Sequence, residues 1–398
     1  MNFIVKFTDS NIKNIILNVC ILLFGINFLY KCNYILMATF ILLLVFKKFK
    51  INFGNKITLI TLILFSISWY VFSDGHDIAG ICLPLCYLIG CNISEEDENG
   101  ITKLILLVSI SLALYTTLFF INNALKNGIT NYDVYNQPNI WTGRPLWATN
   151  IMLYSSLFYG CFGFVVFDKN TKFKILYFII FVINAFYAFM LGRRAALLMI
   201  GLSLVVSFIC KLIFDKENKK RYLKIMYLLL IIGIVSLLLM AVLYKFNILD
   251  FKEIIKRTDL YIRFIGSGRP WLLFYDMGRS EIRKRFISHM IEYPWGGSHI
   301  RELVGNYAHD LWLDAYDVAG LVSAIIMVLY SVLFVINIIK IMKNKNINSA
   351  FKTLIISLSI CILAQCCIEP IMEACKAYIF AVCLIDGAIS IIGDKCNE

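Results

Sequence analysis

Long apolar runs recur along almost the whole chain of 398 residues, and the longest polar segment that interrupts them is 246–310. Hydrophobic residues make up 60% of the chain and charged residues only 16%, which is outside the usual range of soluble domains. A helix that crosses a bilayer needs roughly 17–25 mostly apolar residues, and it satisfies its own backbone polar groups. The sequence therefore predicts an all-α, polytopic membrane protein.

About twelve segments meet the length and composition of a membrane span. They are 12–31, 33–47, 57–73, 78–93, 101–121, 148–167, 173–191, 195–214, 225–244, 315–339, 351–369 and 371–392. This pattern predicts three parts, with spans one to nine in 1–245, a large polar loop in 246–310, and spans ten to twelve in 311–398.

The lysines predict the orientation of these spans. Loops rich in lysine and arginine remain in the cytoplasm. With the N-terminus placed there, the cytoplasmic segments hold twenty lysines and a single arginine, Arg221. Both termini are then cytoplasmic, and the loop 246–310 faces outward. Because the positive residues are divided between the two sides of the membrane in this way, the formal charge of +12 does not indicate a surface for nucleic acid. We expect contact with membrane lipid and no nucleic-acid partner.

The arginines are distributed in the opposite way, because ten of the eleven fall on the predicted outward side. Seven of them lie in the polar loop: Arg257, Arg263, Arg269, Arg279, Arg283, Arg285 and Arg301. A guanidinium group presents a planar fork of donors that matches phosphate and carboxylate oxygens. An anionic ligand at the outer leaflet is one interpretation. The other is that the eight acidic residues of the loop pair with these arginines.

Arg193 and Arg194 interrupt an apolar stretch that extends from Lys174 to Lys211. Charge near the membrane core is costly and usually marks a functional site, although long basic side chains can also extend to the interface. Arg144, in the outward polar segment 122–147, is a further candidate for contact with a substrate.

The polar loop contains a predicted amphipathic helix that begins at Gly278-Arg279-Ser280 and ends at Pro294. Its apolar stripe consists of Ile282, Phe286, Met290 and Tyr293. Arg283 lies off that stripe, so the basic face can meet lipid head groups. Arg279 is close to the backbone N–H groups of the first turn, which also favour anions.

His309 and Asp310 lie where the chain returns to the membrane. Histidine is the side chain best suited to accept a proton near neutral pH, although Asp310 is able to hold it in a structural pair instead. On the predicted outward loops the only compact group of potential metal ligands is Asp74, His76 and Asp77, and a metal site there is the weaker alternative. The sequence has no Gly-rich phosphate loop and no zinc spacing, so we expect neither a cofactor nor a bound metal.

Three of these elements together resemble the bacterial O-antigen ligase family, whose superfamily also includes O-antigen polymerases. The elements are the arginine-bearing turn 192–198, the helix from Gly278-Arg279 to Pro294, and His309-Asp310 followed by Gly320. Arg194 is aligned with the family arginine because the run Ala-Ala-Leu-Leu follows it. The resemblance covers most of the chain from Ala185 to Leu321. The chain departs from the family at Asp310, where Asn, Ser or Gln is usual, and at Ser323.

The resemblance implies a glycosyltransferase of the bacterial inner membrane with its active site facing the periplasm. Such an enzyme transfers O-polysaccharide from undecaprenyl diphosphate to the lipid A core by an inverting, metal-independent reaction. It also implies that Arg194 and Arg279 bind the diphosphate and that His309 is the base. Arg193, Arg283, Arg144 and Asp310 are further substrate-binding candidates. An O-antigen polymerase remains an alternative, and an anionic-solute transporter is an alternative of a different class.

The lysine distribution makes the orientation testable. We expect reporter fusions at Asn136 and at Ser298 to show periplasmic activity, because both positions lie in outward segments. A fusion in 340–352 is the cytoplasmic control. A cytoplasmic signal from either outward fusion would contradict the orientation.

Overall fold

The computed structural model describes residues 9–73, 77–93, 97–128, 137–168, 174–248, 256 and 278–395. Within these ranges the fold is all-α, as predicted, and its strands are limited to a two-residue antiparallel pair, β1 (Gln137–Pro138) and β2 (Pro145–Leu146). Six described helices are long and apolar enough to cross a membrane: Glu98–Lys126, Ala148–Phe167, Arg194–Phe214, Lys216–Phe246, Leu311–Lys343 and Ser349–Cys366. The chain is therefore a membrane protein, and the number of twelve spans stays a prediction.

Several observed helices differ from the expected spans at their ends. The segment expected to cross as 371–392 is divided into α16 (Ile371–Ala374) and α17 (Lys376–Lys395), because Cys375 is not helical (φ −154°, ψ 81°). The segment expected at 351–369 forms α15 (Ser349–Cys366), so Glu369 lies beyond the end of that helix. Apolar composition marks the segment but not the residue at which its helix ends.

The chain forms two compact units, each assembled from segments that are distant in sequence. Unit 1 comprises Met1–Leu112, Arg283–Asn344 and Pro370–Glu398. Its elements, besides α16 and α17, are α1 (Asp9–Gly25), η1 (Phe28–Tyr30), α2 (Cys32–Phe46), α3 (Lys56–Phe72), η2 (Ile78–Ile81), α4 (Cys82–Ile93), α13 (Ser298–Val304) and α14 (Leu311–Lys343). Two helices, α5 (Glu98–Asn127) and α12 (Arg279–His289), begin in one unit and end in the other.

Glycines bring α4 and α17 of unit 1 into direct backbone contact. A Cβ atom on Gly90 would lie 1.9 Å from the carbonyl oxygen of Leu384, and one on Gly387 would lie 2.0 Å from the carbonyl oxygen of Tyr87. Small residues allow this approach between helices in lipid, where association depends on close packing. The two contacts are symmetric, because a glycine of each helix packs against the backbone of the other helix.

A break in α14 receives the turn that follows α12. Within α14, Ala319 and Gly320 depart from helical geometry, and Gly320 has a φ of 80°. The freed N–H of Leu321 donates to the carbonyl oxygen of Pro294 at 2.8 Å. A Cβ atom on Gly320 would lie 2.9 Å from that same oxygen. Both the positive φ and the close contact therefore require glycine at position 320.

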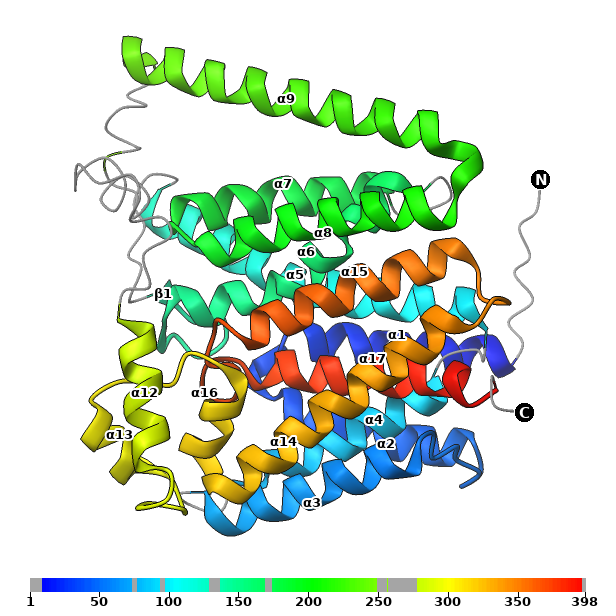
Figure 1. Cartoon of the computed structure of the whole chain (residues 1–398), viewed down its shortest axis with the longest axis vertical. Coiled ribbons are helices and arrows are strands. Elements are labelled where there is room, and N and C mark those ends of the chain that lie inside the picture. The colour runs from blue at the N-terminus through cyan, green and yellow to red at the C-terminus, as the bar shows by residue number, and fades with distance from the viewer. Residues whose placement is uncertain are drawn as a thin grey trace. The chain divides into compact units, whose positions relative to one another are not determined.

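Unit 2 comprises Ala113–Ile282 and Lys345–Glu369. Its elements are β1, β2, α6 (Ala148–Phe167), α7 (Lys174–Met190), α8 (Arg194–Phe214), η3 (Lys216–Asn218), α9 (Lys219–Phe246) and α15. Helices α6, α8 and α15 pack on one another, and Figure 1 shows α8 and α15 in that group. By contrast α9 is exposed along most of its length, and Tyr222 is its buried residue.

Serine and glycine form the contact between the three packed helices of unit 2. Ser203 of α8 accepts the N–H of Gly163 at 2.9 Å and donates to the carbonyl oxygen of Gly160 at 2.8 Å. Ser357 of α15 donates to that same oxygen at 3.2 Å. A Cβ atom on Gly163 would lie 2.1 Å from the carbonyl oxygen of Ser203, so α6 and α8 also meet at their backbones.

These contacts predict how glycine substitutions affect stability. We expect Gly90→Ala and Gly163→Ala each to destabilise the protein by about 1–3 kcal/mol, because the added methyl group meets a carbonyl oxygen that cannot easily move. Gly201→Ala in α8 is the matched control, since no atom lies within 4 Å of its new Cβ. Thermal melts of the three purified variants check this expectation. Equal melting temperatures for all three would contradict it.

Candidate functional site

Three arginines that the sequence singles out act on one buried carboxyl group in unit 2. Arg279, the first residue of α12, donates from Nη1 to the carbonyl oxygen of Ile368 at 2.8 Å. Its Nη2 lies 3.9 Å from Oε1 of Glu369. Arg193 and Arg194 exert an electrostatic effect on the same carboxyl group. We call Arg193, Arg194, Arg279 and Glu369 the arginine cluster.

Local geometry places Arg193 and Arg194 at the N-terminal end of α8. Gly192, with a φ of 63°, ends α7, and the N–H of Arg193 donates to the carbonyl oxygen of Ala188 at 2.9 Å. The side chain of Arg193 then donates from Nη1 to Oγ1 of Thr149 in α6 at 2.9 Å. Both guanidinium groups therefore belong to a helix end whose first N–H groups have no partner within the helix.

Burial is the largest influence on Glu369 and raises its pKa above the ordinary value of 4.5, while the three arginines oppose that rise. With Glu369 ionised, three guanidinium groups attract this one carboxylate. The first turn of α8 adds N–H groups at the same end of the helix. The arrangement suits an anion with several oxygens and more than one negative charge, because each guanidinium can bind two oxygens.

Glu369 is the member of the cluster that the sequence patterns do not single out. It falls at the last position of the expected span 351–369, far along the chain from the arginines. The available signal is an acidic residue within an apolar segment, which is costly unless it has a partner. Pro370, directly after it, also indicates the end of a helix.

His309, Asp310 and Arg283 lie together in unit 1. Arg283 donates from Nη2 to the carbonyl oxygen of His309 at 3.0 Å, and its Nε lies 3.2 Å from Oδ2 of Asp310. The other carboxylate oxygen of Asp310 caps α14 by accepting the N–H of Leu313 at 2.8 Å. Arg283 thus fixes the backbone of His309 at the start of the helix.

This geometry gives Asp310 a structural explanation. Burial raises the pKa of its carboxyl group, while the N–H of Leu313 and the guanidinium of Arg283 act in the opposite direction. Asp310 thus has two partners, the first turn of α14 and Arg283. The interpretation that an acidic residue of the loop pairs with one of its arginines therefore holds for Arg283. Its substrate-binding role stays a prediction, as does that of Asp310.

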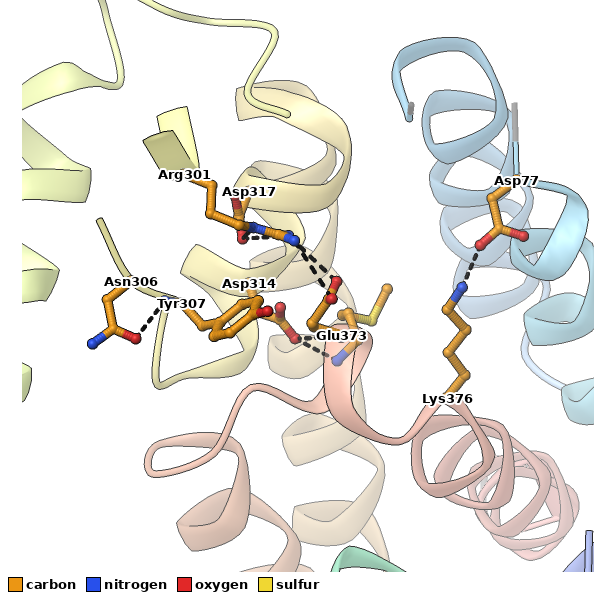
Figure 2. Close-up of polar contacts among 9 residues, drawn as sticks. Asp77, Arg301, Asn306, Tyr307, Asp314, Asp317, Glu373 and Lys376 are labelled. Carbon is orange, nitrogen blue, oxygen red and sulfur yellow. Dashed lines mark hydrogen bonds and ion pairs between the residues drawn. The ribbon is translucent and has the colours of Figure 1, made fainter. Parts of the chain in front are cut away.

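Arg301 belongs to a second network in unit 1, shown in Figure 2. From α13 it donates two hydrogen bonds to Oδ2 of Asp317 in α14, at 3.1 Å from Nε and 2.8 Å from Nη2. Its Nη2 lies 3.3 Å from Glu373 of α16, and its guanidinium carbon lies 4.9 Å from the ring centre of Tyr307. Two carboxylates and a ring therefore hold this arginine.

Asp314, one turn before Asp317, is fully buried and belongs to the same network in Figure 2. Its Oδ2 accepts the backbone N–H groups of Met372 and Glu373, the latter at 3.2 Å. The carboxylate thereby fixes the short α16 against α14. Sequence patterns single out neither Asp314 nor Asp317, because both fall near the start of an apolar segment that reads as a span.

The alternative metal group of Asp74, His76 and Asp77 is described only at Asp77, and the other two lie outside the described residues. Asp77 pairs with Lys376 of α17 and accepts the N–H of Ala79 at 2.9 Å (Figure 2 shows the pair). Among the residues that the structure describes, no group of three His, Cys, Asp or Glu side chains is arranged to hold a metal ion.

Arg144 is exposed in the turn between β1 and β2. Its carbonyl oxygen accepts the N–H of Asn139 at 2.8 Å, and its own N–H approaches Oγ1 of Thr142 at 3.4 Å. Within the described ranges its side chain makes no ion pair, and its role in substrate binding stays a prediction.

No family model matches this chain, and the comparison with curated proteins gives no match. A functional assignment for the chain therefore depends on the geometry of its residues and on the resemblance of its motifs.

The raised pKa of Glu369 predicts a pH dependence of stability. Between pH 4.5 and the higher pKa of the folded protein, the folded state binds more protons than the unfolded state. The contribution of Glu369 to the free energy of unfolding is then greatest at low pH and falls as pH rises. Glu369→Gln removes this titration. We expect the melting temperature of wild type minus variant to decrease from about pH 4 to about pH 8.

Glu302→Gln is the control for that series, because Glu302 is an exposed acid outside the arginine cluster. Its difference from wild type should change little with pH. If the melting temperature of wild type minus Glu369→Gln instead increased with pH, the arginines rather than burial would have the larger effect on the pKa of the Glu369 carboxyl group.

Proposed function

We propose that this chain is an O-antigen ligase, a glycosyltransferase of the bacterial inner membrane with about twelve spans and its reactive groups facing the periplasm. The observation that carries the proposal is the arginine cluster, in which Arg193, Arg194 and Arg279 act on a single carboxylate. A lipid-linked diphosphate at the membrane surface is an anion whose charge and oxygen geometry suit such a group.

The proposed reaction joins the O-polysaccharide to a sugar of the lipid A core. The acceptor hydroxyl oxygen attacks the anomeric carbon, and the bond from that carbon to the diphosphate oxygen breaks with inversion. The leaving undecaprenyl diphosphate retains the electron pair and gains negative charge, which Arg194 and Arg279 stabilise. His309 accepts the proton of the hydroxyl group. Diphosphate is a good leaving group, so the reaction requires neither nucleotide nor metal.

Glu369 has a role in this proposal that only the structure suggests. A cluster of three arginines without an anion would be strongly self-repelling, and Glu369, when ionised, supplies a counter-charge in the absence of donor. A bound diphosphate would place its negative charge beside the same three guanidinium groups. The Nη2–Oε1 distance of 3.9 Å leaves the Arg279 fork incompletely engaged by Glu369.

Two alternatives make different products. An O-antigen polymerase would use a second lipid-linked glycan as acceptor, and the same cluster would serve it. Lipopolysaccharide from a strain that lacks the chain separates the two. Loss of the whole ladder with accumulation of lipid-linked polymer supports the ligase, whereas core carrying a single repeat supports the polymerase. An anionic-solute transporter would instead require flux in proteoliposomes, and its site would lie near the bilayer midplane rather than at helix ends.

The diphosphate role of the arginines predicts a strong effect of conservative change. We expect Arg194→Lys and Arg279→Lys to lower the transfer rate by about 10²–10³, because lysine cannot form the bidentate contact that strengthens in the transition state. The assay is transfer of glycan to lipid A core by purified protein. Arg285→Lys, an exposed residue on the same helix as Arg279, is the control and should retain activity. Full activity in the Arg194 and Arg279 variants would refute the assignment.

The proposed base predicts a loss of rate without a loss of protein. We expect His309→Ala to insert at normal levels and to retain lipid-linked donor, but to transfer glycan about 10²–10⁴ more slowly. His299→Ala, which changes another histidine of the same loop, is the matched control. A structural role for His309 would instead lower the yield and the melting temperature. Normal transfer by His309→Ala would exclude it from the mechanism.

A further inference from the structure

A second charged site lies in unit 2 at the other end of α8. Lys211 is 17 residues from Arg194, which corresponds to about 26 Å along a helix. It lines a pocket of about 210 Å³ together with Arg221, Tyr222, Asp168 and Asp215. The N-terminal end of α15 completes the wall. None of these residues belongs to the arginine cluster.

Lys211 is a buried cation that lines this pocket. The residue is only 3% exposed. Its described neighbour is the ring of Tyr222, whose centre lies 5.9 Å from Nζ. Among the described residues, Lys211 forms no ion pair, and its ammonium group forms no hydrogen bond. The carboxylates of Asp168 and Asp215 attract it electrostatically, but neither is close enough to form an ion pair. An ammonium group that lines a pocket and has no hydrogen-bond partner among the described residues is able to bind a ligand that supplies acceptors.

Asp215 does not act as the acceptor for the ammonium group of Lys211, because other donors already bind its oxygens. It accepts a hydrogen bond from the hydroxyl group of Tyr222, and Asn218 donates to its two oxygens at 2.9 and 3.2 Å. The bond from Tyr222 is the largest cause of its lowered pKa, so Asp215 stays ionised near neutral pH. Tyr222 and Asn218 thus provide the hydrogen-bond partners of the Asp215 carboxylate.

The remaining charges favour an anion. Arg221 contributes a second cation to the lining of the pocket. Two cations and two carboxylates therefore line it, and one of these carboxylates, that of Asp215, already accepts hydrogen bonds from Tyr222 and Asn218. The positive end of the 18-residue helix α15 adds positive potential to the lining. A phosphoryl group offers the several oxygens that a lysine, an arginine and a helix end bind together.

We propose that this pocket binds a phosphoryl group, with Lys211 and Arg221 as the residues that contact it. In the predicted orientation the pocket is on the cytoplasmic side, remote from the periplasmic chemistry proposed above. The phosphoryl group is supplied either by the head group of an anionic phospholipid or by a soluble phosphate ester. The volume of about 210 Å³ accommodates a head group but not a glycan chain.

The test uses the full-length protein in detergent, with inorganic phosphate and glycerol 3-phosphate as probes at constant ionic strength. We expect each probe to raise the melting temperature in a saturable manner, because a ligand that binds the folded state stabilises it. Lys211→Met should abolish the response. Arg221→Gln should weaken the apparent affinity by about tenfold, which is the effect of losing one charge-assisted contact. Arg221→Gln also serves as the second variant if Lys211→Met does not fold.

Lys216→Met is the matched control, because Lys216 belongs to the adjacent η3 and does not line the pocket. A second arm identifies the source of the phosphoryl group. Protein from vesicles of phosphatidylcholine with and without phosphatidic acid is compared by native mass spectrometry for retained lipid. Phosphatidic acid that is retained by Lys216→Met but lost from Lys211→Met identifies a lipid ligand, and a response to the soluble probes alone identifies an ester. If the Lys211 and Lys216 variants behave alike in both arms, the proposal is wrong.

Discussion

Close backbone contact between helices is the constraint on which this structure depends. Lipid tails are as apolar as leucine side chains, so the helices of such a chain gain little from burying apolar surface against each other. The structure instead uses glycine and serine where helices meet, as at Gly90 and Gly387 in unit 1 and at Gly163 and Ser203 in unit 2. These contacts fix the separation of the helix axes. The positions of the side chains at the helix ends, including those of the arginine cluster, follow from that separation.

The buried carboxylates Asp310, Asp314 and Glu369 obey a related rule, because each has partners that compensate for lost solvation. Asp310 accepts a backbone N–H at the start of α14, and Asp314 accepts two at α16. Glu369 is compensated mainly by charge, from three guanidinium groups. Removing one partner of such a group leaves a buried charge without compensation, which costs more than the contact itself contributes. The polar contacts at the helix ends therefore determine which segments pack together, as the contacts between the apolar parts of the helices do.

Sequence patterns predict the apolar segments well and the contacts poorly. The span expected at 195–214 matches α8, which begins at Arg194, because two arginines and a glycine mark its start. Hydropathy does not predict the break at Cys375, because it indicates whether a segment prefers lipid or water and not the geometry of its backbone. For the same reason it does not predict that Glu369 interacts with the arginines. Arg194 and Arg279 are 85 residues apart, and only the fold brings both to one carboxyl group. Partner choice is a tertiary property that composition does not encode.

Five of the described arginines fall into two classes according to the carboxyl groups near them. In unit 1, Arg283 has one carboxylate partner and Arg301 has two, so acids match or exceed the guanidinium groups. These pairs tie the segments around α12 and α13 to α14, and their positive charge is already balanced. In unit 2, Arg193, Arg194 and Arg279 all act on the carboxyl group of Glu369. Arginine on the predicted outward side therefore has two different surroundings in one chain. Arg283 and Arg301 pair with carboxylates that hold the fold, whereas three arginines act on the single carboxyl group of Glu369, and it is this second arrangement on which the proposed anion site is based.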